Sequence, residues 1–236
     1  MLAVDVGRRL RRRSAGKCPG DKGMTLVELI VAMGILTVVL AIFMAGVVSM
    51  VKTTVRSETA TTANDQMRNV FQRMDREIRY ASDINRPGIV SGKQYVEYRY
   101  VDDQNEGVAT CVQWRYDSSA GELQRREWTE GKTSTITSWI TLVTKGRNNL
   151  SVADQLPFTF YRAGKDLTTG VTYTTQRLRV HLDAGLGSFG DGRGSQLDTV
   201  FIARNSTDQA QTNLDSDNDG VTDVPVCLGD DGVTRS

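Results

Sequence analysis

A long run of apolar residues near the start of the chain dominates its hydropathy pattern. Residues 24–51 contain a single charged side chain, Glu28. A helix needs about 20 apolar residues to cross a bilayer, so this stretch is long enough to span one. Residues 1–23 carry seven Lys or Arg against Asp5 and Asp21, a net charge of +5. Basic flanks stay in the cytoplasm, which places the chain after Val51 outside the membrane.

The pattern changes to an amphipathic one after Lys52. Apolar side chains recur at spacings of three and four, with charged residues between them: Met67, Val70, Phe71, Met74, Ile78 and Ala81. This periodicity predicts that the helix continues to about residue 84, where Asn85-Arg86-Pro87-Gly88 ends it. An apolar stripe of this width covers one face of a sheet.

Short segments with β-branched and aromatic residues follow the helix and predict strands. In the first of these segments, residues 95–101, Val96, Tyr98 and Tyr100 are expected on one face of the strand. The expected strands are Tyr95–Val101, Thr110–Tyr116, Glu122–Trp128, Thr135–Val143, Pro157–Tyr161, Gln176–Asp183 and Thr199–Ala203. Strands that follow one long helix indicate an α+β fold, with an antiparallel β-sheet packed on the amphipathic half of the helix.

Composition and motifs exclude several classes of function. The whole chain carries a net charge of +1, which gives no reason to expect direct nucleic-acid binding. His181 is the single histidine, so a multi-histidine metal site is excluded, and we expect it to be an ordinary strand residue. Gly185–Gly190 matches a glycine-rich phosphate loop, but no helix is expected after it, so we expect a surface loop. The sequence shows no catalytic constellation, and we expect no enzyme activity.

Glu28 is the feature that a plain membrane anchor does not explain, because a carboxylate inside a membrane segment is costly and needs a partner or a role. A cleaved secretory signal is a second alternative, with a cleavage site near Ala45-Gly46. Its apolar core would be about 7–15 residues, much shorter than the run observed here.

Residues 22–30, Lys-Gly-Met-Thr-Leu-Val-Glu-Leu-Ile, resemble the leader and cleavage site of type IV pilins and type II secretion pseudopilins. The resemblance implies that a prepilin peptidase cuts between Gly23 and Met24 and that Met24 becomes the N-methylated first residue. Met24 stands where phenylalanine is commoner in that family. Ala45-Gly46 stand where many major pilins have a helix-breaking proline.

The resemblance also gives Glu28 a role in assembly. Cleavage creates a positive amine at Met24, and Glu28 can pair with the amine of a neighbouring subunit or with its own. Pairing between subunits favours insertion into a growing filament at one axial register. The implied partners are other pilin or pseudopilin subunits, the prepilin peptidase and the inner-membrane assembly machinery.

The expected organisation has five parts. A basic cytoplasmic leader at 1–23 is removed, 24–51 forms the membrane and filament-core helix, and 52–84 forms its amphipathic half. Residues 85–204 form the exported β-sheet domain, and 205–236 form a polar tail. We expect a single-pass protein of the inner (cytoplasmic) membrane that later enters a cell-surface pilus or a periplasmic pseudopilus. The strand order and residues 197–205 are similar, more loosely, to minor pilins and pseudopilins of the J/W type, which fits a tip or initiation complex.

Two features of the exported part predict local sites. Cys111 and Cys227 are the cysteines left after cleavage, and in an oxidising exterior they form either a disulfide or two free thiols. Residues 215–223 resemble the calcium loops of EF-hand and thrombospondin type 3 repeats. The expected Ca²⁺ ligands are Asp215, Asp217, Asp219, Val221 through its carbonyl, and Asp223; a solvated acidic tail is the alternative.

The sequence therefore predicts a structural subunit, a minor type IV pilin or pseudopilin, that is the substrate of an enzyme and not an enzyme itself. The alternative is a signal-anchored exocytoplasmic binding domain or enzyme that does not assemble.

Overall fold

The computed structural model describes residues 23–101, 107–165, 170–207, 214–217, 222–228 and 233–235. The chain divides between Val51 and Lys52 into two units, which are described separately here. Helix α1 (Leu26–Arg79) has residues in both. We call its residues 26–51 the apolar half and its residues 52–79 the packed half. The unit that begins at Lys52 is called the head.

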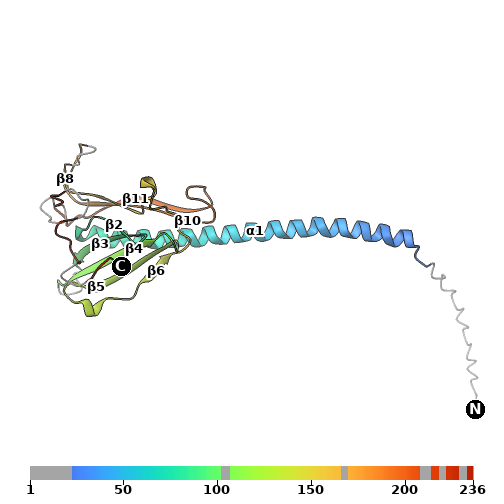
Figure 1. Ribbon diagram of the computed structural model, residues 1–236, viewed down its shortest axis with the longest axis horizontal. Coiled ribbons are helices and arrows are strands. Elements are labelled where there is room, and N and C mark those ends of the chain that lie inside the picture. Colours follow the sequence, from blue (N-terminus) through green and yellow to red (C-terminus); the bar gives the residue numbers. More distant parts are fainter. Residues whose placement is uncertain are drawn as a thin grey trace, which may run out of the picture. The chain divides into compact units, whose positions relative to one another are not determined.

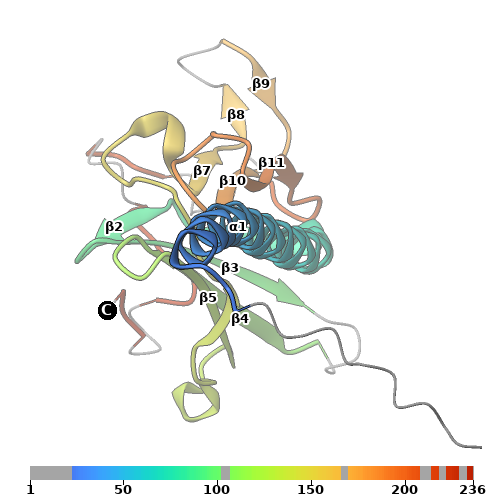
Figure 2. The same ribbon diagram turned by 90° about the vertical axis from the view of Figure 1, so that its right-hand side faces the viewer.

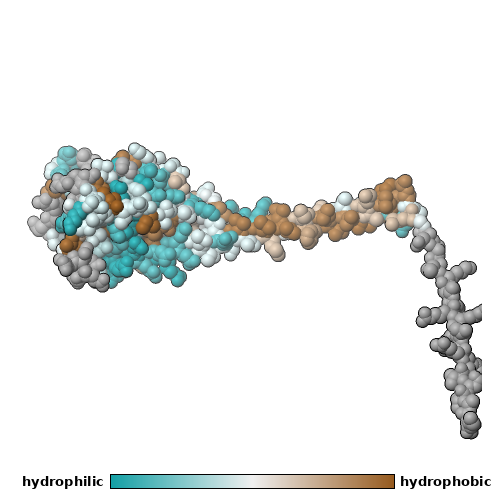
Figure 3. Space-filling view, turned by 90° about the horizontal axis from the view of Figure 1, so that it is seen from below, coloured by the Kyte–Doolittle hydropathy of each residue, from teal (hydrophilic) through white to brown (hydrophobic). Residues whose placement is uncertain are grey.

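The apolar half has no buried residue. Each of its side chains is exposed, from Leu26 to Val51, and its surface in Figure 3 is almost continuously apolar. Its length and composition suit a membrane-spanning helix. The described residues therefore leave the apolar surface of this half uncovered, as is typical of a membrane or protein interaction surface.

The head places antiparallel sheets on two opposite sides of the packed half (Figures 1 and 2). The large sheet has the order β1-β3-β4-β5-β6, with β2 also paired to β3. Its strands are β1 (Ala81–Ile84), β2 (Gly88–Val90), β3 (Lys93–Val101), β4 (Ala109–Asp117), β5 (Glu122–Thr129) and β6 (Ile140–Val143).

The small sheet has the order β11-β10-β7. Its strands are β7 (Phe158–Tyr161), β10 (Arg177–Gly185) and β11 (Gly194–Ile202). The described residues also form a separate pair of short strands, β8 (Gly164–Lys165) and β9 (Thr172–Tyr173), and the 3₁₀ turns η2 (Thr133–Thr135) and η3 (Ala153–Gln155).

One hydrophobic core joins these layers. The packed half contributes the buried stripe that the periodicity predicted, from Ala63 through Met67, Val70 and Met74 to Ile78. The large sheet adds Val96, Tyr98, Val112, Trp114, Tyr116 and Leu123, and the small sheet adds Phe158, Leu178, Val180, Leu182 and Phe201. The predicted α+β fold of one long helix on antiparallel strands is confirmed, and the architecture is consistent with the pilin fold. The sequence did not predict the second layer of strands.

The end of the helix was predicted too late. Helix α1 ends at Arg79, and residues 81–84 form strand β1, paired antiparallel with β3 through Ala81↔Tyr100 and Ile84↔Tyr98. Ala81 and Ile84 are both buried, and apolar residues three apart over so short a segment could not separate a helical turn from a strand. Pairing with β3 satisfies the backbone of these residues and decides the outcome.

Two strand boundaries also differ from the prediction. Of the segment 135–143, only Ile140–Val143 is a strand, because Thr133–Thr135 form a 3₁₀ turn. Strand β11 begins at Gly194 and not at Thr199, and its nine residues pair with β10 without interruption. The residues at its start are mostly polar, and an edge strand exposed on one face accommodates such side chains.

Candidate functional site

The predicted processing site lies in an exposed, non-helical segment. Residues Gly23, Met24 and Thr25 precede α1 and have no regular secondary structure. Nothing lies within 4 Å of the position that a Cβ on Gly23 would occupy. The Gly23–Met24 peptide bond is therefore open to an approaching peptidase, and the space around Gly23 imposes no need for glycine.

Thr25 and Glu28 form part of a helix cap that the sequence reasoning missed. Thr25 Oγ1 accepts a hydrogen bond from the backbone N–H of Glu28 at 3.3 Å, and Leu29 N–H bonds to Thr25 O at 3.1 Å. Thr-x-x-Glu is the sequence signature of a capping box. The carboxylate of Glu28 also lies in the first helical turn, where the helix dipole favours negative charge. Thr25 thus fixes where the helix starts, two residues after the predicted cleavage point.

Glu28 itself is exposed, and its carboxylate has no partner among the described residues. It lies among apolar side chains that are also exposed, such as Val27, Leu29 and Ile30. A carboxylate in such surroundings requires a cation when the helix enters a membrane or a packed filament. The described part of this chain supplies none beside it.

A second glutamate of α1 is fully satisfied inside the head. Glu77 is 4% exposed and accepts a hydrogen bond from Arg125 at 2.8 Å and from the Tyr98 hydroxyl at 2.6 Å. Trp114 Nε1 donates to the Tyr98 oxygen at 2.8 Å, and Arg125 also reaches Glu127. Burial opposes the charged form of Arg125, but Glu77, Tyr98 and Glu127 together outweigh it and raise the pKa of Arg125. This network fixes the register of the packed half on the large sheet.

Sequence reasoning did not identify this network. Its one signal was Glu77 beside Ile78 in the apolar stripe, a charge at a position next to the predicted core. Which cation on the sheet faces Glu77 depends on strand register, and the helix-to-sheet register is a tertiary property.

The structure joins Cys111 and Cys227 in a disulfide with a Cα–Cα distance of 5.6 Å. Cys111 lies in β4 on the face of the large sheet that points away from α1, next to the buried Trp128 of β5. Cys227 and Val233 belong to the C-terminal tail and pack in the same small cluster. The disulfide therefore ties the described part of the tail to the outer face of the large sheet.

Polar contacts hold the tail at three further points. Glu97, fully buried in β3, pairs with Arg235 at 2.8 Å. The amide side chain of Asn85 donates to Val226 O at 2.6 Å and accepts from Val226 N at 2.9 Å. Arg126 donates to Thr234 O at 3.2 Å. These contacts and the disulfide attach the described segments of the polar tail to the head.

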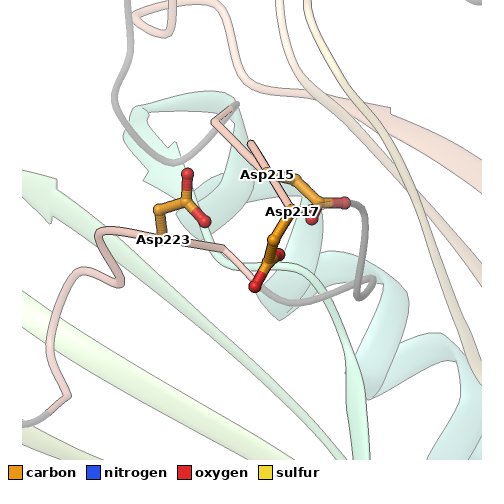
Figure 4. Close-up of side chains that lie close together, drawn as sticks. All are labelled: Asp215, Asp217 and Asp223. Carbon is orange, nitrogen blue, oxygen red and sulfur yellow. The ribbon is translucent and has the colours of Figure 1, made fainter.

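The acidic loop brings three of its predicted ligands together (Figure 4). Asp215, Asp217 and Asp223 each offer a carboxylate oxygen, and these oxygens lie within 4.8 Å of one another. Asp219 and Val221 lie outside the described residues. Asp223 accepts hydrogen bonds from the side chain and the backbone of Ser216, which lower the pKa of its carboxyl.

Asp215 anchors the acidic loop to the sheet. Its side chain is 9% exposed, and Oδ2 pairs with Arg86 at 3.3 Å. Oδ1 is buried and has no hydrogen-bond partner among the described residues. A buried carboxylate oxygen without a donor is costly, so this atom retains the capacity to bind a proton donor or a cation.

The remaining candidates behave as structural residues. His181 lies in β10, and its Nδ1 is 2.9 Å from Asp154 O. The glycine-rich segment is the β10–β11 loop, held by an Arg147–Asp183 ion pair and by Arg147–Asp191 at 2.6 Å. Strand β11 follows it, so the helix N-terminus that a phosphate loop needs is absent from this described segment.

The comparisons with known proteins identify the N-terminal segment. The family model of the prokaryotic N-terminal methylation motif matches residues 18–44. No curated protein matches the chain, and no solved structure does. The matched range contains Gly23, Met24 and Glu28, and it ends within the exposed apolar half. The chain therefore carries the methylation motif that marks a type IV pilin-like prepilin signal, which supports a pilin-like or pseudopilin protein processed by prepilin peptidase.

Proposed function

We propose that this protein is a minor type IV pilin or pseudopilin, a structural subunit that is cleaved between Gly23 and Met24, methylated at Met24 and assembled into a filament. The observation that carries the proposal is the apolar half of α1: a fully exposed apolar helix with one carboxylate, Glu28, in its first turn. A membrane anchor alone explains the apolar surface, whereas assembly also explains the carboxylate.

The proposed role of Glu28 is to set the axial position of the subunit relative to its neighbour through an ion pair. After cleavage, the Met24 amine of one subunit and the Glu28 carboxylate of another attract strongly where water is excluded, and either group left unpaired is costly. The pair therefore favours one axial register during insertion. The competing arrangement is a pair within one subunit, because Glu28 also lies about one helical turn from its own Met24.

The proposed place in the filament is its tip or initiation complex. The support is the looser resemblance to J/W-type minor subunits, together with a head that carries sheets on both sides of its helix. Before assembly, the protein resides in the inner membrane with its head outside. The rival function is a signal-anchored exocytoplasmic domain, with binding or enzyme activity, that never assembles.

The N-terminal residue of the native protein tests the proposal. Mass spectrometry of the membrane fraction should find N-methylated Met24 as the first residue. An intact Met1, or a start near residue 47, would contradict the pilin function and favour the anchored or secreted alternative.

Two variants separate processing from assembly. Gly23→Ala should block cleavage, and Glu28→Val should leave cleavage intact while reducing filament incorporation by about tenfold or more, as expected for an uncompensated buried charge. Glu58→Val is the matched control, since Glu58 is an exposed glutamate in the packed half of the same helix. Equal incorporation of the Glu28→Val and Glu58→Val proteins would remove the assembly role.

We also propose that the acidic loop binds Ca²⁺ and fastens the tail to the head. Three clustered carboxylates and the unpartnered Oδ1 of Asp215 support a hard cation with oxygen ligands. The twelfth position of an EF-hand loop holds Val226 and not an acid, so the expected affinity is that of weak extracellular sites.

Calcium should raise the melting temperature of the head, measured on the full chain in detergent. At about 1 mM Ca²⁺, a weak extracellular-type site is occupied well enough to stabilise the folded state by mass action. The shift should be lost in the Asp217→Asn/Asp223→Asn variant. An unchanged melting temperature at millimolar Ca²⁺ would contradict the site.

A further inference from the structure

Side-chain amides close the backbone edges of the sheets in the head. Strand β7 is an edge of the small sheet, and Gln94 covers it at Phe158 with two hydrogen bonds. Phe158 N–H donates to Gln94 Oε1 at 2.9 Å, and Gln94 Nε2 donates to Phe158 O at 3.0 Å. One glutamine side chain thus imitates the backbone of a further strand.

Glutamines also accept from one backbone N–H at the end of each outer strand of the large sheet. At β6, Thr144 N–H donates to Gln66 Oε1 at 3.1 Å. At β1, Ile84 N–H donates to Gln176 Oε1 at 2.7 Å. The part of β5 beyond β6 is covered by Thr137 and Thr135, whose hydroxyls accept from Glu127 N–H and Thr129 N–H. Proteins commonly protect edge strands because open edges pair with other chains.

Strand β11 is an edge without such a cover. It has nine residues in regular antiparallel register with β10, so alternate N–H and C=O groups point away from the sheet. Between Ser195 and Phe201, the backbone N–H and C=O groups that point away from the sheet have no hydrogen-bond partner among the described residues. The strand contains no proline, no lysine and no bulge. Val200 and Ile202 are instead 45% and 43% exposed.

A groove runs between this edge and the packed half of α1. Phe71, Asp75 and Arg79 line it from the helix, and residues 199–202 and Arg204 line it from the strand side. Phe71 is partly exposed, and its ring centre lies 5.6 Å from that of Phe201. Asp75 and Arg79 pair with each other at 2.5 Å, whereas the exposed guanidinium of Arg204 has no partner among the described residues. The groove therefore combines the aromatic rings of Phe71 and Phe201 with polar and charged side chains, and one Asp against two Arg gives it a net positive charge.

We propose that β11 is a docking edge that accepts one extended strand from the head of a different pilin-like subunit. The strand adds to the small sheet beside β11, places aliphatic side chains against Val200, Ile202 and Phe71, and presents a carboxylate to Arg204. Backbone pairing supplies the affinity, and the side chains supply the specificity. This inference rests on the proposed assembly into a filament and names the surface through which this subunit meets its neighbour.

A second copy that offered its own β11 would not extend a filament. Two such copies would meet edge to edge through β11 of each. An edge that meets itself relates the copies by a two-fold axis and makes a closed pair, whereas a growing filament needs a contact between two different surfaces. The strand therefore comes from another polypeptide, which makes this chain a partner of a distinct subunit.

The test uses the full chain in its own cells, with a benzophenone-bearing residue in place of Gln196, an exposed residue of β11. Irradiation should give one main adduct, and mass spectrometry should assign the linked peptide to the head of another protein with a prepilin methylation motif. Val200→Lys/Ile202→Lys should lower the adduct by about tenfold, because it buries unpaired charge at the edge. Ile140→Lys is the matched control, an exposed isoleucine on the covered edge strand β6, and should leave the adduct unchanged.

Each other outcome overturns the inference. An adduct with a second copy would make β11 a homodimer contact, and an adduct with a protein that lacks the motif would make the partner something other than a subunit. N-methylated Met24 without any adduct would leave the proposed function intact and remove the docking edge. An unprocessed N-terminus in the same sample would remove the proposed function and this inference together.

Discussion

Helix α1 carries two glutamates in otherwise apolar surroundings, and their situations are opposite. Glu77 in the packed half is buried and hydrogen-bonded to Arg125 and Tyr98. Glu28 in the apolar half is exposed among apolar side chains, and its carboxylate has no partner among the described residues. Glu77 thus finds its partners within the head, whereas the described residues supply none for Glu28.

The same contrast holds for the apolar side chains of the two halves. Met67, Val70, Met74 and Ile78 are buried between the two sheets, while large side chains such as Ile35 and Leu36 are more than half exposed. Burying an aliphatic side chain is worth about 1.5–3 kcal/mol. The packed half gains this stabilisation from the fold itself. The apolar half does not gain this stabilisation from the described fold, because its side chains are exposed.

The largest expected difference in the stability of the head is that between variants in which Glu77 or Glu28 is removed. Glu77→Ala leaves Arg125, which is 2% exposed, without its main counter-charge, and should lower the free energy of unfolding of the head by about 3–5 kcal/mol. Glu28→Ala should change it by less than about 0.5 kcal/mol. Denaturant unfolding of the full chain in detergent, followed by the fluorescence of the buried Trp114 and Trp128, measures both. A similar loss in the two variants would contradict the separation of the halves.

Matched truncations along the helix should sharpen the comparison. Ile78→Ala removes a fully buried side chain and should cost about 2–5 kcal/mol of head stability. Ile35→Ala, at a position 62% exposed, should cost less than about 0.5 kcal/mol in the same measurement. The order should reverse for retention in the membrane fraction, where only Ile35 contributes apolar surface. A destabilised head in Ile35→Ala would mean that the apolar half packs on the head.

The disulfide tests how far the head depends on its tail. Replacing Cys111 and Cys227 with alanine removes a cross-link between residues 116 apart and should cost about 2–4 kcal/mol, with less effect if the tail contacts persist in the unfolded chain. The Glu97–Arg235 pair and the Asn85–Val226 hydrogen bonds remain in this variant. Protease should therefore cleave the tail of the double variant faster than that of the parent, while the core strands stay protected. An unchanged cleavage rate would show that the polar contacts alone hold the tail.

The parts of this structure that follow from local pattern were predictable. The apolar run, the buried stripe of the packed half, and strands β3, β4, β5 and β10 all follow from periodicity in the sequence. Strand β1 was not predictable, because four residues after a helix carry no period long enough to distinguish a turn of helix from a strand. The second sheet was not predictable either. Nothing local in residues 177–202 says on which side of α1 they pack.

The residues of the candidate site also differ in whether the local sequence reveals them. Gly23, Met24 and Glu28 could be predicted as candidates because the prepilin motif consists of residues close together in the sequence, and the methylation-motif match covers them. The Thr25 cap was missed although its Thr-x-x-Glu signal is local. The Glu77–Arg125 pair joins residues 48 apart and depends on the register of a helix on a sheet, which the sequence does not display. Long-range pairs of this kind require the tertiary structure.

The smallest expected effect is a pH dependence of the stability of the head. The apolar half should not share it. Asp117 ends β4, and its carboxylate accepts from Ser119 and Ala120 N–H and pairs with Lys93 at 3.0 Å. Burial alone would raise the pKa of Asp117, but these contacts outweigh it and hold the pKa well below its usual value near 4. A carboxyl with a lowered pKa in the folded state stabilises the fold above the unfolded pKa and loses that contribution as the pH falls toward the folded one.

Asp117→Asn should therefore cost about 1 kcal/mol of head stability at neutral pH, and its difference from the parent should shrink as the pH falls from about 4 toward 2. Melting curves of the full chain in detergent across this range measure the difference. Asp65→Asn is the control, because Asp65 is an exposed aspartate of the packed half, and it should follow the parent throughout. A difference that stayed constant with pH would mean that the substitution costs stability through altered hydrogen-bond geometry and not through the lost charge. Since Glu28 is the one titratable side chain between Met24 and Val51, acid unfolding of this kind belongs to the head.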